Sequence, residues 1–269
     1  NEPIAAEQLR LVAPGVTMGG ARPKALVDVE GLPWVVKFAD PGEPTDAPLV
    51  EHATMTLARL ARITTAETRA IRLIDGHALA IRRFDRVLAS DGSLNRIHAQ
   101  SAHVALGAAG ELPGYPELAQ LLRRRGIAGL NTEQMHELFR RMVFNILIDN
   151  TDDHDKNHVL LMRDDGQLEL APAFDVLPSG QALGYQQMRV GNDDADATID
   201  NALSMCAQFG LKRDAAVGQA REVARVVRRW TTHFANEGVG VRDLDYHAAQ
   251  IDRPFLRDQR SELIKANAS

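Results

Sequence analysis

The sequence of 269 residues predicts an α+β fold of two lobes, with a β-rich N-lobe over residues 1–85 and a mostly helical C-lobe over residues 86–269. Two observations support this prediction. Short runs rich in β-branched residues, separated by glycine turns, fill the first third of the chain. Longer amphipathic runs with capping residues follow from Arg86 onward. A chain of this length can bury the core of one large domain or of two lobes.

The composition excludes several classes of protein. A hydrophobic fraction of 45% and a charged fraction of 25% are typical of a globular domain. The net charge of −5 argues against a general binder of phosphate backbones, so we expect no direct nucleic-acid binding. Cys206 is the only cysteine, which excludes a disulfide framework and a cysteine-based zinc site. With no apolar run of membrane-spanning length and no signal-peptide pattern, we expect a cytoplasmic protein without a membrane partner.

The first strands are predicted from period-2 alternation. Ala25–Val29 alternates as a half-buried strand does, and Pro33–Phe38 follows after a Glu-Gly turn. An earlier strand over Val12–Thr17 leads into two adjacent glycines, Gly19 and Gly20. Adjacent glycines are a hairpin signal, but a glycine turn between strands also lets backbone N–H groups approach phosphates. Both interpretations stay open.

The remainder of the predicted N-lobe is a helix and a hairpin. A loop with three prolines, residues 40–48, precedes a helix from Leu49 to Ala61 with apolar residues on one stripe. Ala70–Ile74 and Ala78–Ile81 form a hairpin around an Asp-Gly turn. The second of these strands runs directly into the connector Arg82–Arg86, which leads to the helical lobe.

The helical lobe is predicted from capping residues, amphipathic periodicity and turn signals. One further hairpin interrupts the helices, and one acidic, polar segment is expected to be an exposed loop. The expected segments are a short helix that opens over Ile97–Ser101, helices over Glu117–Arg124 and Thr132–Ile148, a hairpin of Val159–Met162 and Gln167–Leu170, the exposed loop Gly191–Asp200, a helix over Asp214–Phe234, and a closing helix over Tyr246–Leu263 that Pro254 interrupts.

The most informative stretch follows the apolar end of the Thr132–Ile148 helix. Asp and Asn crowd the segment from Asp149 to Asn157, and within it Asp152 and Asn157 have the spacing D-x-x-x-x-N. Such residues are also common in ordinary loops, where they form Asx-turns and helix caps. So much like charge beside a buried segment nevertheless indicates a cation or ligand that offsets it.

A D-x-x-x-x-N pair followed by a lone Asp is the arrangement that protein kinases use. The first Asp orients the attacking hydroxyl, and the Asn and the later Asp hold Mg²⁺ through oxygen ligands. Here the later residue is Asp175, and the Val159–Leu170 hairpin would place Asn157 and Asp175 at its two open ends. The sequence therefore predicts a two-lobed protein-kinase-like fold.

Two residues of the N-lobe fit this prediction but have ordinary alternatives. Lys37 lies inside a strand, where a lysine is usually an edge or solvent-facing residue, whereas a kinase lysine at such a place contacts the α- and β-phosphates. Glu51 lies near the start of the following helix. It is either an acid favoured by the helix dipole or the partner of Lys37, as in kinases.

With these residues assembled, the chain resembles the HipA family of bacterial toxin kinases. The segment Asn150–Asn157, with the letters NTDDHDKN, is the most specific part of the resemblance. The supporting motifs are Gly19–Lys24 (GGARPK), Arg83–Arg86 (RFDR) and Pro172–Asp175 (PAFD).

The resemblance implies roles for individual residues. Asp152 is the catalytic base, with Lys156 also at the catalytic centre, and Asn157 and Asp175 are the metal ligands. Thr17 falls where some members carry an autophosphorylated Ser, which implies a regulatory position. The residues implied to line the nucleotide are Gly19, Gly20, Ala21, Arg22, Pro23, Lys24, Lys37, Arg82, Arg83, Phe84, His154, Asp155, Lys156, Asn157, Phe174 and Asp175.

The resemblance also implies an activity and partners. They are an ATP- and Mg²⁺-dependent serine/threonine kinase, neutralised by a HipB-type DNA-binding antitoxin. The implied protein substrate is a translation component such as an aminoacyl-tRNA synthetase, whose modification arrests growth. Two alternatives stay open: a stand-alone HipA-like kinase with another substrate, and a catalytically weak kinase-fold binding module. The intact set of Lys37, Asp152, Asn157 and Asp175 argues against the binding module.

Overall fold

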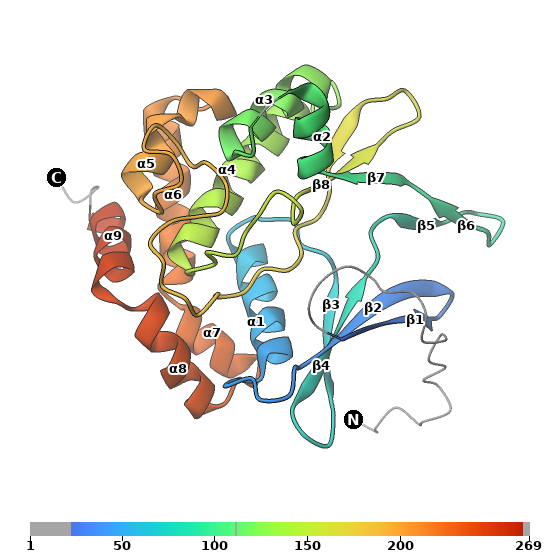
Figure 1. Cartoon of the computed structure of the whole chain (residues 1–269), viewed down its shortest axis with the longest axis horizontal. Helices are drawn as coiled ribbons and strands as arrows, with labels where there is room; N and C mark the ends of the chain where they lie inside the picture. The colour runs from blue at the N-terminus through green and yellow to red at the C-terminus, as the bar shows by residue number, and fades with distance from the viewer. Residues whose placement is uncertain (1–22, 111, 266–269) are drawn as a thin grey trace.

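The computed structural model describes residues 23–110 and 112–265. A sheet-rich part and a helical part lie side by side, with α1 (Ala47–Leu60) between the sheet and the helices (Figure 1). The remaining elements, in chain order, are β1 (Lys24–Val29), β2 (Leu32–Phe38), β3 (Thr68–Arg72), β4 (His77–Arg82), β5 (Arg86–Leu88), β6 (Leu94–Arg96), β7 (His98–Ser101), α2 (Ala102–Ala109), α3 (Tyr115–Arg125), α4 (Asn131–Leu147), β8 (Val159–Met162), β9 (Leu168–Leu170), α5 (Ile199–Ser204), the 3₁₀ helix η2 (Cys206–Phe209), α6 (Arg213–Val227), α7 (Trp230–Asn236), α8 (Val241–Ile251) and α9 (Pro254–Lys265).

The first sheet is antiparallel, with the strand order β1-β2-β4-β3. Its β1–β2 hairpin turns at Glu30 and Gly31, both of which have positive φ. The register places Lys24 opposite Lys37, and Lys37 opposite Leu79 of the next strand. Because β2 has neighbours on both sides, Lys37 is an interior-strand residue and not an edge residue.

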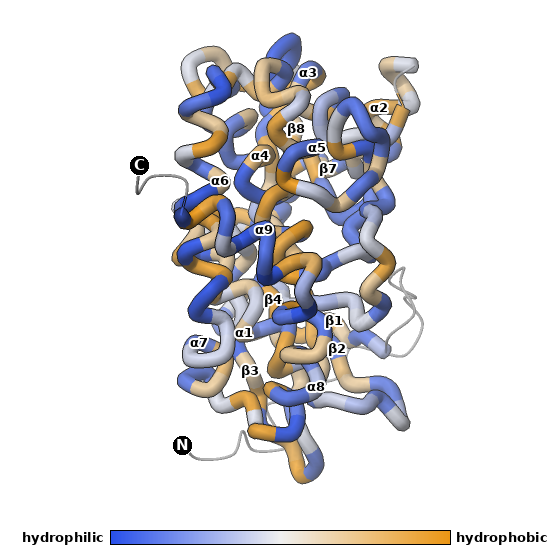
Figure 2. The backbone as a smooth tube through the Cα atoms, turned by 90° about the vertical axis from the view of Figure 1, so that its left-hand side faces the viewer, coloured by the Kyte–Doolittle hydropathy of each residue, from blue (hydrophilic) through white to orange (hydrophobic). Residues whose placement is uncertain are grey.

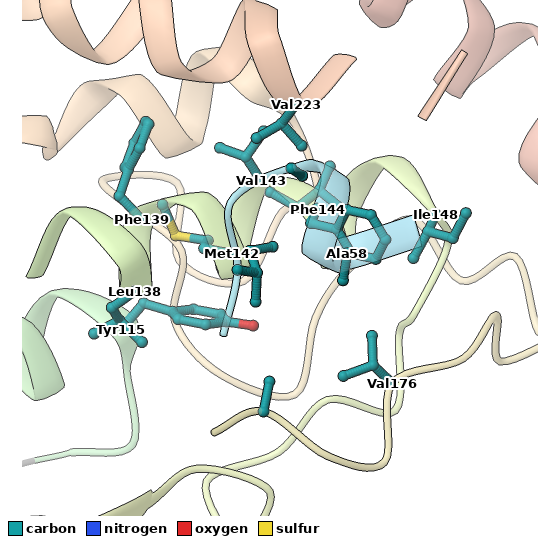
Figure 3. Close-up of a cluster of buried hydrophobic side chains, with 14 of the residues drawn as sticks. Ala58, Tyr115, Leu138, Phe139, Met142, Val143, Phe144, Ile148, Val176 and Val223 are labelled. Carbon is teal, nitrogen blue, oxygen red and sulfur yellow. The ribbon is translucent and has the colours of Figure 1, made fainter. Parts of the chain in front are cut away.

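The main core joins α1 to the helical part. Figure 3 shows Ala58 of α1 close to Phe144 and Ile148 from the end of α4, with Val223 of α6 above them. Each of these four residues is at most 1% exposed. Hydrophobic and hydrophilic segments alternate along the helices, as expected for helices that bury one face (Figure 2). Burial of this kind fixes α1, and therefore the residues it carries, relative to the loop that follows α4.

Three predicted elements differ from the structure. Ile97–Ser101 does not open a helix, because His98–Ser101 pairs with β8, and α2 begins only after Ser101, whose hydroxyl accepts from the Val104 N–H. The predicted helix Asp214–Phe234 is two helices, since α6 ends at Val227 and α7 begins at Trp230. The loop expected to be exposed over Gly191–Asp200 is exposed over residues 192–194 and at Asp196, but Gly191 and Ala197 are buried, and its last residues already belong to α5.

Pro254 begins α9, which accounts for the interruption predicted in the closing helix. Among the described residues, no helix combines the length and the hydropathy that crossing a lipid bilayer requires.

Candidate active site

A cavity of about 380 Å³ contains most of the chemically active side chains predicted from the sequence. Lys37 contributes from β2, Asp152 and Asn157 from the loop after α4, and Asp175 from the segment after β9. These four residues come from three separate parts of the chain, so their convergence is a result of the fold. The described residues that line the cavity are Lys24, Lys37, Asn150, Asp152, His154, Asn157, Asp175, Leu177, Pro178, Ser179 and Gln181.

Lys37 is buried and bound by two carboxylates. Its Nζ lies 2.7 Å from Oε1 of Glu51 and 2.5 Å from Oδ1 of Asp175. Burial alone would lower the pKa of Lys37, but the two carboxylates outweigh it and raise the pKa above its ordinary value, so Lys37 stays a cation. The pairing interpretation of Glu51 is therefore correct, and the solvent-facing interpretation of Lys37 is wrong.

Asp149, at the start of the loop after α4, connects this loop to other parts of the chain. Asp149 has a φ of 62°, in the left-handed region that Asp tolerates better than most residues. Its carbonyl oxygen accepts hydrogen bonds from the N–H and the hydroxyl of Ser179, at 3.0 and 3.1 Å. Its carboxylate pairs with Arg253 at 2.7 Å. These contacts tie the Asp152 loop to the segment that follows Asp175.

Asp175 is placed by its own backbone and by an aromatic neighbour. It has a φ of 59°, again in the left-handed region. The preceding residue, Phe174, packs against Phe84 with ring centroids 5.6 Å apart. The side chain of Asp175 remains 38% exposed, so one carboxylate is held against Lys37 while still facing the cavity. As predicted, Asn157 and Asp175 converge across the β8–β9 hairpin.

Several other predicted nucleotide residues lie outside the cavity lining. Asp155 is buried and pairs with His103 at 2.8 Å, and Lys156 is exposed. Arg82 pairs with Glu67. The others outside the lining are Pro23, Arg83, Phe84 and Phe174, whereas Thr17, Gly19, Gly20, Ala21 and Arg22 lie outside the described residues.

Arg83 makes a bidentate contact with the carboxylate of Asp85, at 2.9 and 2.6 Å. The pKa of Asp85 is lowered although burial opposes this, because Arg83 and Arg86 both stabilise its charged form. The connector arginines are therefore engaged with neighbouring carboxylates.

The sequence interpretation missed five cavity residues: Asn150, Leu177, Pro178, Ser179 and Gln181. Four of them lie in the segment after Asp175, to which no motif or periodicity of the sequence assigned a role. Ser179 also contacts the hydroxyl of Thr151 at 2.5 Å. The signal that could have identified this segment is its position, because it directly follows Asp175, which lines the same cavity.

The residues present fit a hard divalent cation better than a soft one. Within the described part of the chain, no group of three or more His, Cys, Asp or Glu side chains is arranged to hold a metal. An amide oxygen from Asn157 and a carboxylate from Asp175 line the same cavity. Mg²⁺ is commonly bound by one or two protein ligands together with waters and substrate phosphates. This donor set suits such an ion when a phosphate ligand is also bound.

Comparison with solved structures identifies the fold. HipA of Shewanella oneidensis MR-1, solved with HipB and its operator DNA, superposes with a TM-score of 0.67 at 18% identity, over 94% of this chain and 65% of its own. The proinflammatory kinase CtkA of Helicobacter pylori superposes with a TM-score of 0.63 at 13% identity, over 94% of this chain and 96% of its own. The predicted two-lobed protein-kinase-like fold is confirmed.

Two relatives from Sinorhizobium fredii share recognisable sequence. The provisionally named kinase Y4dM is 26% identical over 246 residues, which are 82% of this chain and 58% of Y4dM. The provisionally named kinase Y4mE is 31% identical over 106 residues, which are 37% of this chain and 24% of Y4mE. The chain thus spans 58% or less of these relatives' lengths.

A family model, the HipA-like C-terminal domain, matches residues 16–230. The match includes Lys37, Glu51, the loop with Asp152 and Asn157, and Asp175. It therefore covers every residue whose convergence forms the cavity. On this match and on the fold, the chain belongs to the HipA-like C-terminal domain family.

Proposed function

We propose that this protein is an ATP- and Mg²⁺-dependent serine/threonine protein kinase of the HipA type. The observation that carries the proposal is the single cavity lined by Lys37, Asp152, Asn157 and Asp175, with Lys37 paired to Glu51. Phosphoryl transfer depends mainly on positioning and charge neutralisation, and kinases use a Lys–Glu pair, an Asp, an Asn and a second Asp for these tasks.

Each side chain has a proposed task. Asp152 is exposed to the cavity and makes no ion pair with the other described residues, so it is available to orient the acceptor hydroxyl and receive its proton. Asn157 and Asp175 would hold Mg²⁺, which neutralises the charge of the phosphates when bound. Lys37 would contact the α- and β-phosphates, and Lys24 and His154 line the same space.

Further parts of the nucleotide site are proposed from the family resemblance. They are the glycine-containing segment Gly19–Lys24, the connector Arg82–Phe84, and Asp155, Lys156 and Phe174. In this arrangement the connector backbone would hydrogen-bond the adenine edge.

The proposal is tested by nucleotide binding and by transfer. Purified protein should show a higher melting temperature with ATP and Mg²⁺ together than with either one alone. Incubation with radiolabelled ATP and a bacterial lysate should label a protein band on Ser or Thr. Absence of both the thermal response and the labelled band would contradict the kinase assignment.

We also propose that the kinase acts as the toxin of a HipA/HipB-type toxin–antitoxin system. Support comes from the family match and from the fold shared with a HipA that was solved with HipB and operator DNA. The proposed partner is a HipB-like DNA-binding antitoxin, and the proposed substrate is a translation component such as an aminoacyl-tRNA synthetase. Induced expression should arrest bacterial growth, and phosphoproteomics of the arrested cells should identify the substrate. Equal growth with the wild type and with Asp152→Asn would contradict the toxin role.

A stand-alone kinase is the second candidate. The observation that favours it is the alignment with 96% of the CtkA chain, a protein named as a proinflammatory kinase and not as part of a toxin–antitoxin pair. A small helix-turn-helix gene beside this one, whose product co-purifies with the kinase and relieves growth arrest, would favour the toxin role. A kinase that modifies its substrate in cells without any such neighbour would favour the stand-alone role.

A further inference from the structure

The residues next to Asp152 and Asn157 in the chain belong to a buried polar network. Its centre is Asp153, which is 2% exposed although its chain neighbour Asp152 faces the cavity. Oδ2 of Asp153 accepts a hydrogen bond from the hydroxyl of Tyr115 and contacts Nε2 of His158 at 2.8 Å. Tyr115 and His158 are themselves 0% and 3% exposed. We name Asp153, His158 and Tyr115 together the loop clip.

The positions of the clip residues in the sequence matter more than their burial. Asp153 directly follows Asp152, and His158 directly follows Asn157. The Asp153–His158 contact therefore joins the two ends of the D-x-x-x-x-N loop. It holds the two ends of this short loop together, directly beside the proposed base and the proposed metal ligand.

Tyr115 fixes the clip to the helical part of the molecule. It is the first residue of α3, and its N–H donates to the carbonyl of Arg189 at 3.0 Å. Its ring packs edge-on against His158, with centroids 5.3 Å apart. Figure 3 shows Tyr115 among buried side chains of α4, including Leu138 and Met142. The hydroxyl therefore reaches Asp153 from a ring that the core holds in place.

The surroundings of Asp153 and Tyr115 favour the ionised carboxylate and the neutral phenol that their hydrogen bond requires. Burial favours neutral Asp153, but His158 and the Tyr115 hydroxyl outweigh it and lower the pKa of Asp153. Burial and the Asp153 charge raise the pKa of Tyr115 well above its ordinary value, so the phenol remains a donor. A buried carboxylate without such partners would be strongly destabilising, which makes the clip a constraint on the loop.

The network continues to the cavity through two amides. Nδ2 of Asn145 donates to the Tyr115 hydroxyl at 3.3 Å, and Nδ2 of Asn150 donates to Oδ1 of Asn145 at 3.1 Å. Asn150 itself lines the cavity. A void of about 10 Å³ beside Asp153 and His158 is at most the size of one water molecule. The space beside Asp153 and His158 is therefore too small to admit more than one water molecule to the network.

We infer that Asp153, His158 and Tyr115 are positioning residues that set the separation of Asp152 and Asn157 for catalysis. The inference rests on the proposed kinase function. None of the three lines the large cavity, so their effect is exerted through the loop and not through contact with the nucleotide. Misplacement of a catalytic group by about 1 Å can cost about 100-fold in rate.

The first variant is Tyr115→Phe, which removes one hydroxyl and retains the buried ring. We expect kcat to fall by about 10- to 100-fold with little change in the KM for ATP. Amide hydrogen exchange of a peptide covering residues 149–158 should accelerate without nucleotide, while exchange of α4 stays at the wild-type rate. Tyr185→Phe is the matched control, because the same hydroxyl is removed from a half-exposed ring, and it should match the wild type.

The second comparison is Asp153→Asn against Asp153→Ala. Asn keeps one acceptor oxygen, so it should retain more of kcat than Ala does at the same ATP concentration. Tyr115→Phe with wild-type kcat and wild-type loop exchange would overturn the inference while leaving the kinase function intact. If the wild type transfers no phosphate, the proposed function fails, but loop exchange still decides whether the clip orders the loop. Exchange that accelerates equally across the whole chain would show a general loss of stability and would also overturn the inference.

Discussion

At the scale of single residues, Asp152 and Asp153 are adjacent carboxylates in opposite environments. Asp152 is exposed to the cavity, whereas Asp153 is buried with two partners. Asp152 lies in a turn and Asp153 follows it directly, so one short loop supplies both a solvated base and a buried anchor. Sequence spacing distinguishes the two only through the Asn five residues after Asp152.

Asp152→Asn keeps the size and shape of the side chain but removes the proposed base. We expect turnover to fall by about 10²- to 10⁴-fold, the usual contribution of a positioned acid–base group, while nucleotide binding persists. Single-turnover transfer and calorimetric ATP binding measure the two effects separately. Asp164→Asn, at the exposed turn between β8 and β9, is the matched control and should behave as the wild type. Loss of ATP binding in Asp152→Asn would show that its role is different.

Asp175→Ala removes a proposed metal ligand and one of the two carboxylates that contact Lys37. Mg²⁺-dependent ATP binding should weaken, because a direct ligand is lost and the ammonium group is held by Glu51 alone. Titration of ATP binding against Mg²⁺ concentration should require more Mg²⁺ than the wild type does. Unchanged binding and turnover in Asp175→Ala would mean that Asp175 is not a ligand.

At the scale of elements, α1 is the helix that connects the sheet to the site, and its N-terminus is tied at several points. Oδ1 of Asp46 caps the N–H of Leu49 at 3.4 Å, and Oδ2 contacts His77 at 2.5 Å. The Asp46 N–H in turn donates to Asp243 of α8 at 2.9 Å. Because α1 carries Glu51, these contacts also help to position Glu51 for its ion pair with Lys37.

Asp46→Ala should therefore destabilise the protein. The loss of a helix cap typically costs about 0.5–2 kcal/mol of unfolding free energy, and urea unfolding at neutral pH measures it. Asp258→Ala, in the exposed face of α9, is the control and should change stability by less than about 0.5 kcal/mol. Equal midpoints for the two variants would exclude an energetic role for the cap.

The sequence predicts an element well when the residues that determine it are close together in the chain, and poorly when they are far apart. The hairpins of β1–β2 and β3–β4 were predicted because glycine turns and alternation are local signals. The strand His98–Ser101 was not, since its partner is β8, some 60 residues later in the chain. The break between α6 and α7 was also missed, because the amphipathic pattern runs on, whereas the indole of Trp230 donates to Asp252, the residue that follows α8.

The site shows the same division. The spacing of Asp152 and Asn157 is local and was readable, whereas the Lys37–Glu51 contact was left open because it requires β2 and α1 to pack together. The buried state of Asp153 was not predictable, since its partner Tyr115 lies 38 residues earlier, at the start of α3. The proposed roles of Lys156 and of Arg82–Phe84 remain predictions.

At the scale of the whole molecule, acid stability should depend on His247. This residue is 4% exposed, and burial lowers its pKa to about 4 despite the nearby Asp243. Between pH 6.5 and 4 the unfolded chain binds a proton at His247 that the folded chain does not, so unfolding becomes easier as pH falls. At 1.36 kcal/mol per pKa unit, the loss approaches about 3 kcal/mol near pH 4.

His247→Leu should therefore lose less stability than the wild type when urea unfolding is compared at pH 7 and pH 4.5. The exposed His98→Gln variant is the control and should follow the wild type at both values. If the stability loss is the same in all three proteins, His247 does not contribute to the acid response.

The family match ends at Trp230, the first residue of α7, yet residues after Trp230 contact α1 and the loop that carries Asp152. His233 of α7 contacts Thr56 of α1 at 2.9 Å. Arg253 donates to the Asp149 carboxylate and, at 2.8 Å, to the carbonyl of Ala182.

A protein shortened at the family boundary would thus keep every proposed catalytic side chain. It would lose the contacts that His233 makes with α1 and that Arg253 makes with the loops containing Asp149 and Ala182. For anyone choosing fragments of related proteins for crystallisation or inhibitor screening, the limit of sequence similarity is the wrong place to cut.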